Sequence, residues 1–183
     1  MFNSFPMRSV IATAVFLLLP IATSQAAEPQ SAAQLTEFRS KEGKFSVHLL
    51  GEPVHETTEV GDAKETQHQF STPAAQGVYL VSYQDNPNLK GKPPKEMELA
   101  LESGRDRLLG AFEGELLESK SLKLNEVHPG LNFRLTIPRA QGEARCRFYM
   151  VGTRLYQILV IGAPDFVNAE QATEVIDSFK LLP

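Results

Sequence analysis

The chain has 183 residues, a formal net charge of −4 and a single cysteine. A mildly acidic protein of this size lacks the basic surface of a nucleic-acid binder or of a protein held electrostatically on an anionic membrane. A lone cysteine excludes an intrachain disulfide, so the hydrophobic core must supply the stability of the folded protein.

The first 26 residues have the pattern of a cleavable export signal. Arg8 is the only charge before Glu28, residues 10–22 are almost entirely apolar, and Ser24-Gln25-Ala26 places small residues at both cleavage positions. Spanning a bilayer takes about 20 apolar residues, and no later run reaches that length. We therefore expect an exported protein, periplasmic or secreted, without a membrane span after cleavage; an uncleaved anchor is the alternative.

A short leader and one domain follow the signal. Residues 27–37 are rich in Ala, Gln and Ser and show no periodic pattern, which indicates a flexible leader. Residues 38–183 are predicted to form a single domain, because their number suits one hydrophobic core.

The first half of the domain has the alternation that is typical of strands. The expected strands are 45–50, 54–60, 65–71 and 77–83. Gly51-Glu52-Pro53 and Gly61-Asp62 interrupt the pattern and are interpreted as turns. These four strands are expected to form an antiparallel meander.

The period then changes to that of a helix. Beyond Pro93-Pro94, apolar residues recur at steps of three and four until Gly110 and Gly114 end the pattern. Gly104 falls on the apolar face, which indicates close packing against the sheet. Four further strands are expected at 115–124, 131–137, 144–151 and 155–161, and a second helix at 166–181.

The two-residue connection Gly152-Thr153 is the strongest hairpin signal in the chain. It predicts that Tyr149 pairs with Tyr156 and that Cys146 pairs with Leu159. Cys146 alternates with apolar residues, so we expect a buried structural thiol. Strands 79–83 and 155–161 are apolar on both faces, which predicts an α/β fold with a largely antiparallel sheet flanked by helices on both faces.

Several segments of the second half resemble a group of uncharacterised exported bacterial proteins. They are residues 101–106, 114–120, His128-Pro129-Gly130, 147–157 and 177–181. The group is similar to the PsbP-like superfamily, whose namesake is an extrinsic, lumenal subunit of photosystem II. The resemblance extends over residues 45–181 and implies a PsbP-like α/β/α sandwich. It implies neither catalytic residues nor a photosynthetic function.

Four arginines are the first candidate binding site. Arg134, Arg145, Arg147 and Arg154 lie on three predicted neighbouring strands, where they would form a cationic patch for a carboxylate or phosphate. Glu143 and Asp177 would neutralise part of this charge. The alternative is a solvated edge of the sheet with packed arginine stems.

Three histidines are the second candidate, for Zn or Cu. If Gly51-Glu52 and Gly61-Asp62 are two-residue hairpin loops, His48 lies opposite His55, and His55 lies opposite His68. Opposed side chains are about 5 Å apart at Cβ, close enough for a shared metal. The alternatives are solvated strand histidines and no cofactor at all.

Enzyme signatures such as a nucleophile elbow, a phosphate-binding loop or a metal-binding His pair on a helix do not occur in the sequence. The four tyrosines are expected on central strands, where they form core or, alternatively, line an apolar cleft for a ligand. The expected function is an exported non-catalytic binding or assembly-support module for an unknown envelope protein or small ligand. The alternative is an extracytoplasmic hydrolase with a scattered active site.

Overall fold

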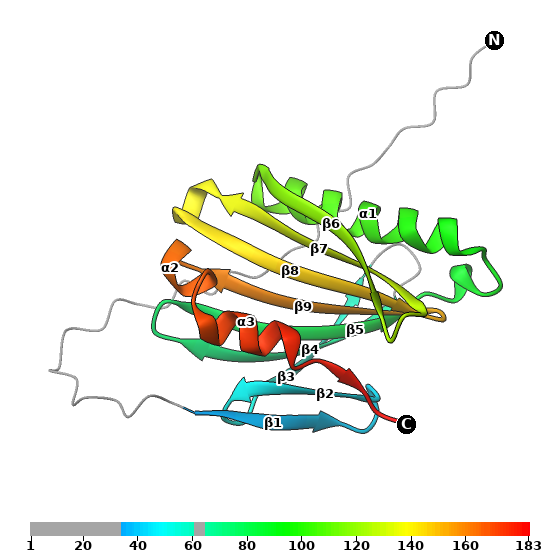
Figure 1. Cartoon of the computed structure of the whole chain (residues 1–183), viewed down its shortest axis with the longest axis horizontal. Coiled ribbons are helices and arrows are strands. Elements are labelled where there is room, and N and C mark those ends of the chain that lie inside the picture. Colours follow the sequence, from blue (N-terminus) through cyan, green and yellow to red (C-terminus); the bar gives the residue numbers. More distant parts are fainter. Residues whose placement is uncertain (1–33, 61–64) are drawn as a thin grey trace, which may run out of the picture.

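The computed structural model describes residues 34–60 and 65–183, which form two antiparallel sheets and three α-helices (Figure 1). The predicted export signal and most of the predicted leader lie outside the described residues. Strand β1 starts at Leu35, three residues before the expected start of the domain. None of the described helices is long and apolar enough to cross a membrane.

The larger sheet has seven strands in the order β3-β4-β5-β9-β8-β7-β6, and all neighbours are antiparallel. The strands are β3 (Val54–Val60), β4 (Glu65–Ala74), β5 (Gly77–Asp85), β6 (Leu116–Leu124), β7 (His128–Ile137), β8 (Gly142–Val151) and β9 (Arg154–Gly162). The predicted hairpin at Gly152-Thr153 is confirmed, with Tyr149 paired to Tyr156 and Cys146 to Leu159.

The smaller sheet has the order β1-β2-β10. Its strands are β1 (Leu35–Ser40), β2 (Phe45–Leu50) and β10 (Lys180–Leu181). The prediction that 45–50 and 54–60 form one hairpin is wrong, because β2 pairs with β1 and β10 whereas β3 pairs with β4. Gly51 adopts a left-handed conformation with φ 68°, and Pro53 lacks the N–H of a ladder residue. The chain uses this turn to pass from one sheet to the other.

Helix α1 (Pro94–Phe112) covers one face of the larger sheet and packs mainly on β7 and β8. The predicted close approach at Gly104 is confirmed, since a Cβ there would lie 3.2 Å from the Phe148 ring. Gly110 lies within the helix instead of ending it. At Gly114 a Cβ would lie 2.1 Å from the Thr136 carbonyl oxygen, so only glycine lets the chain enter β6 here.

The opposite face of the larger sheet is covered by the smaller sheet together with α2 (Pro164–Val167) and α3 (Glu170–Asp177) (Figure 1). Phe45, Val47 and Leu49 of β2 are completely buried in this core. The structure is thus a mixed α/β fold that is mostly sheet, whereas the sequence predicted one sheet between helices.

The C-terminal segment is also more broken than the single helix predicted for 166–181. The backbone is extended at Ala169, between α2 and α3, with ψ 154°. After Ser178, the chain becomes extended and Lys180 pairs with Ser46 of β2. Phe179 falls at a position where the helical pattern calls for an apolar residue. It is buried in the core, but it lies in the segment that leads into β10 and not in a helix.

Cys146 is completely buried, as predicted, and belongs to the core beneath α1. Burial raises the pKa of its thiol far above the ordinary range. A buried thiol of this kind is unreactive.

Candidate functional site

Three of the four predicted arginines lie together on the face of β7 and β8 that is turned toward α3. Arg134 pairs in register with Arg145, and Asn132 pairs with Arg147. The intervening residues, Phe133 and Cys146 among them, point to the opposite face and pack beneath α1. We call Arg134, Arg145 and Arg147 the arginine cluster.

Two members of the cluster are ion-paired, as the sequence indicated. Arg134 Nη2 lies 2.6 Å from Glu143 Oε2, and Arg147 Nη1 lies 2.6 Å from Asp177 Oδ1. Arg147 also donates to the Ile176 carbonyl oxygen. The Arg134–Glu143 pair joins β7 to β8, the Arg147–Asp177 pair attaches α3 to the sheet, and both neutralise members of the cluster.

Arg145, between them, has a different environment. Its Nη1 donates to Thr173 Oγ1 at 2.8 Å, and no ion pair with a carboxylate is formed within residues 34–60 and 65–183. Burial, followed by the neighbouring positive charge of Arg147, lowers the pKa of the Arg145 guanidinium, whereas Asp177 and Glu118 act in the opposite direction. Arg145 remains charged near neutral pH, and its one hydrogen-bond partner in the described part of the chain is neutral.

A donor without a partner lies on Arg134, the residue that pairs with Arg145. Arg134 Nε is buried and has no hydrogen-bond partner among the described atoms. A buried polar group without a partner is rare and is expected to be met by water or by a ligand. The cluster therefore offers donors from two arginines to an anion.

Arg154 lies apart, so the predicted patch of four arginines is wrong in this member. It opposes Val151 at the far end of β8 and holds both carboxylate oxygens of Asp85, at 2.8 and 2.7 Å. Its Nη1 donates to the Glu42 carbonyl oxygen, and its guanidinium lies 4.6 Å above the centre of the Tyr83 ring. Arg154 therefore has a structural role: it joins the turn between β1 and β2 to the larger sheet through its bonds to Glu42 and Asp85.

The three predicted histidines do not meet. His48 lies in the smaller sheet with its Nδ1 3.5 Å from Glu174 Oε1. The expected pairing of His55 with His68 is shifted by two residues, so that His55 opposes Phe70 and lies diagonal to His68. No group of three or more His, Cys, Asp or Glu side chains suited to a metal occurs among the residues that the structure describes.

His55 and His68 nevertheless touch. His55 Nε2 lies 3.3 Å from His68 Nδ1, while the ring centres are 5.6 Å apart and the planes are 17° from parallel. The two nitrogens are closer together than the two ring centres by about two ring radii, so the rings meet edge to edge. The N–H of one ring then donates a hydrogen bond to the bare nitrogen of the other. Phe70 stacks on His55 and Tyr83 on His68, which fixes both rings. Glu42 lies 3.9 Å from His68 Nε2.

Three of the tyrosines form a row across β5, β9 and β8 through the register pairs Tyr83–Tyr156 and Tyr156–Tyr149. Their rings pack with Phe45 and Phe179, so these residues form core. Tyr156 donates to the Gly43 carbonyl oxygen at 2.7 Å. The Tyr83 hydroxyl is buried and has no hydrogen-bond partner within the described ranges.

These tyrosines make the fold sensitive to alkali. Burial is the first cause that raises the pKa of each of the four tyrosines, and it raises the pKa of Tyr83 from 10.0 to about 12. Their contribution to stability is complete below pH 10 and is lost as the pH rises through the folded values. We expect ultraviolet titration to show that tyrosinate forms at a higher pH than in free tyrosine, together with unfolding. Ionisation with a midpoint near 10 in a protein that stays folded would contradict this.

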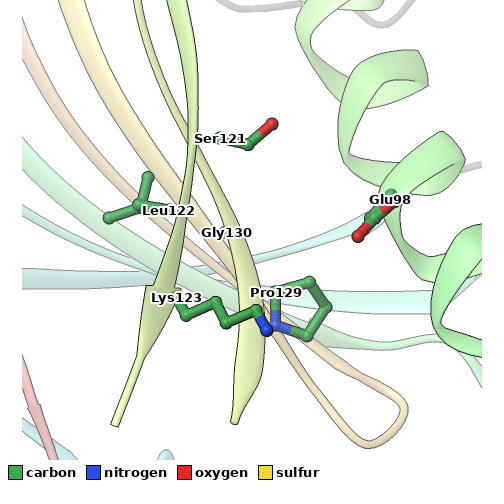
Figure 2. Close-up of a pocket in the computed structure, with 6 residues that line it drawn as sticks. All are labelled: Glu98, Ser121, Leu122, Lys123, Pro129 and Gly130. Carbon is green, nitrogen blue, oxygen red and sulfur yellow. The ribbon is translucent and has the colours of Figure 1, made fainter. Parts of the chain in front are cut away.

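Figure 2 shows a small hollow of about 180 Å³ between α1 and the β6–β7 edge of the sheet. It is lined by Glu98, Ser121, Leu122, Lys123, Pro129 and Gly130. Glu98 projects from the helix toward β6, and Ser121 projects from β6 on the side of the helix (Figure 2). None of the sequence-predicted site residues lies here.

Sequence reasoning missed the groups that the rest of the fold supplies. Thr173 comes to Arg145 from α3, and Glu42 comes to His68 from the turn between β1 and β2. Asp85 comes to Arg154 through the pairing of β5 with β9, which sequence reasoning did not predict.

Sixteen solved protein chains are similar to this chain, among them a cyanobacterial and a Pseudomonas protein. The solution structure of cyanobacterial PsbP (CyanoP) from Synechocystis sp. PCC 6803 has a TM-score of 0.53 and 12% identity, and the match covers 88% of this chain and 99% of that chain. The crystal structure of PA94, a protein of unknown function from Pseudomonas aeruginosa, has a TM-score of 0.46 and 12% identity, with 81% and 96% covered. No protein-family model matches the sequence, and no curated protein matches it.

The order and pairing of the strands define a mixed α/β protein built on two antiparallel sheets. The similarity to cyanobacterial PsbP shows that the fold is PsbP-like, in agreement with the resemblance seen in the sequence. At 12% identity the similarity concerns the fold alone.

Proposed function

We propose that this protein is an exported, non-catalytic binding or assembly-support module that binds an anionic partner through the arginine cluster. The observation that carries the proposal is Arg145, a half-buried cation whose only hydrogen bond within the described ranges goes to a neutral hydroxyl. The signal pattern of residues 1–26 supports export. A carboxylate or phosphate group on the partner would complete the charge balance of the cluster.

The Arg145→Gln variant tests this proposal. Binding of citrate and of inorganic phosphate, measured by isothermal titration calorimetry, is expected to weaken at least about tenfold, because a charge-assisted hydrogen bond is lost. Arg139→Gln is the matched control, since Arg139 is exposed and paired with Glu113 on the surface. An equal loss in both variants, or no loss in Arg145→Gln, would contradict the proposal. Comparing the two probes separates carboxylate from phosphate as the preferred group.

The histidine pair supports a second candidate function, the binding of Zn²⁺ or Cu²⁺. Two nitrogens bound to one tetrahedral zinc ion lie about 3.3 Å apart, and His55 Nε2 and His68 Nδ1 are 3.3 Å apart. Glu42 lies 3.9 Å from the other nitrogen of His68, and a small movement would let it orient a metal-bound histidine as a carboxylate commonly does. Such a site has two histidine ligands and leaves positions open to water or to a partner.

We expect Zn²⁺ or Cu²⁺ to raise the melting temperature of the full chain and His55→Ala to abolish the rise, because one of two ligands is lost. His48→Ala is the control, since His48 lies in the other sheet and should leave the rise unchanged. Absence of a shift in the wild type, or an equal effect of both variants, would rule out this site.

A further inference from the structure

Strand β6 forms one end of the seven-stranded sheet (Figure 1), and none of the described strands pairs with its outer edge. Residues 116–121 are all exposed, and α1 packs mainly on β7 and β8. Three of the five large apolar side chains exposed in the described part of the chain belong to this hairpin, namely Leu116, Leu117 and Val127. An open edge presents unpaired backbone N–H and C=O groups to another strand.

The charges of β6 are complementary to those of a second β6. In an antiparallel pair with its two-fold axis at Ser119, Glu118 of each copy lies opposite Lys120 of the other. Within residues 34–60 and 65–183, neither Glu118 nor Lys120 forms an ion pair of its own. Glu118 lies opposite Arg134 in register and acts on the charge of Arg145, but it forms no close ion pair there, so Glu118 and Lys120 can each form one with a second copy.

Neighbouring registers are unfavourable. Moving the axis by one residue toward the N-terminus places Glu118 opposite its own copy, and moving it by one residue the other way does the same for Lys120. Directly opposed like charges destabilise a strand pair. The axis at Ser119 also brings the start of β6, where the register shifts between Leu116 and Glu118, to the end of the other copy's strand near Leu122.

We propose that two copies of this chain associate through antiparallel pairing of their β6 strands, with the two-fold axis at Ser119. Lysine on an edge strand normally discourages pairing. Here like charges of Glu118 or of Lys120 oppose each other in the two neighbouring registers, whereas the axis at Ser119 pairs Lys120 with Glu118. The two larger sheets then join into one continuous sheet, in a closed dimer that leaves no β6 edge free.

Sedimentation velocity from about 10 µM to about 1 mM tests the proposal on the full chain. We expect the wild type to dimerise, and Lys120→Glu or Glu118→Lys to weaken dimerisation at least about tenfold through like-charge pairs. The double variant Glu118→Lys with Lys120→Glu exchanges the charges and is expected to dimerise again. Lys95→Glu, an exposed change of equal charge on α1, should leave the dimer intact.

Circular dichroism identifies any variant that fails to fold. A wild type that is monomeric up to about 1 mM would overturn the proposal. Folded single variants with undiminished dimerisation, or a folded double variant that remains monomeric, would overturn it as well.

Discussion

Phe45→Ala is expected to lower the free energy of unfolding by about 3–5 kcal/mol, the usual cost of removing a buried aromatic ring. Phe45 is completely buried, and its ring lies within 5.6–6.3 Å, centre to centre, of five other aromatic rings. These rings come from both sheets, so the side chain is the main contact that attaches the smaller sheet to the larger. Denaturation in urea, followed by circular dichroism, measures the change.

Val54→Ala is a suitable control for this experiment. Val54 is 56% exposed on the edge strand β3, so its truncation is expected to change the free energy of unfolding by less than about 0.5 kcal/mol. A Phe45→Ala variant as stable as Val54→Ala would show that β2 does not pack on the larger sheet.

Arg154→Met is expected to lower the free energy of unfolding by about 1.5–3 kcal/mol, because charge-assisted hydrogen bonds to Asp85 are lost. The same change removes the contact with the Glu42 carbonyl and the cation–π contact with Tyr83. Arg139→Met is the control, since the exposed pair of Arg139 with Glu113 contributes little. Binding of citrate should be the same in Arg154→Met as in the wild type.

The effect of Arg154→Met should also depend on pH. The hydrogen bond from Arg154 lowers the pKa of the Asp85 carboxyl, so this contribution to stability is present above the unfolded pKa and is lost as the pH falls. The difference between wild type and variant is therefore expected to shrink in acid. An undiminished difference after Asp85 is protonated would contradict the role of this ion pair.

Local patterns predicted most strands correctly, but not which strands pair. The hairpin at Gly152-Thr153 was predictable to the register because a two-residue turn fixes the pairing. Gly51-Glu52-Pro53 has the same kind of composition, yet it joins two different sheets. The difference arises from the burial of Phe45 and its neighbours against the larger sheet, which is a tertiary contact that no local pattern contains.

Strand β1 was missed for a related reason. Apart from Leu35 and Phe38, its side chains are polar, so the apolar alternation that identifies a strand is weak. Pairing with β2 and ring contacts of Phe38 with Phe45 and Phe70 hold it in place. The end of the last helix was also predicted wrongly. Phe179 fits the helical spacing of apolar residues, but α3 ends at Asp177 with Ser178 as its C-cap.

The arginine cluster was predictable because alternation places Arg145 and Arg147 on one face of β8, and because the preceding strand was expected to be its neighbour. The hairpin at Gly152-Thr153 also predicted Arg154 opposite Val151, four residues along β8 from Arg147. The grouping of all four arginines was wrong because it neglected this distance along the strand. The contribution of Thr173 to the cluster depends on how α3 packs, which the sequence pattern does not specify.

The most direct test of the central claim, that Arg145 binds an anion, is nuclear magnetic resonance of the arginine side-chain Nε–H groups during titration with citrate. We expect the signals of Arg134 and Arg145 to shift with one saturable binding curve, and those of the exposed Arg39 and Arg139 to stay in place. Shifts of equal size at all four arginines, or none at Arg145, would contradict the claim.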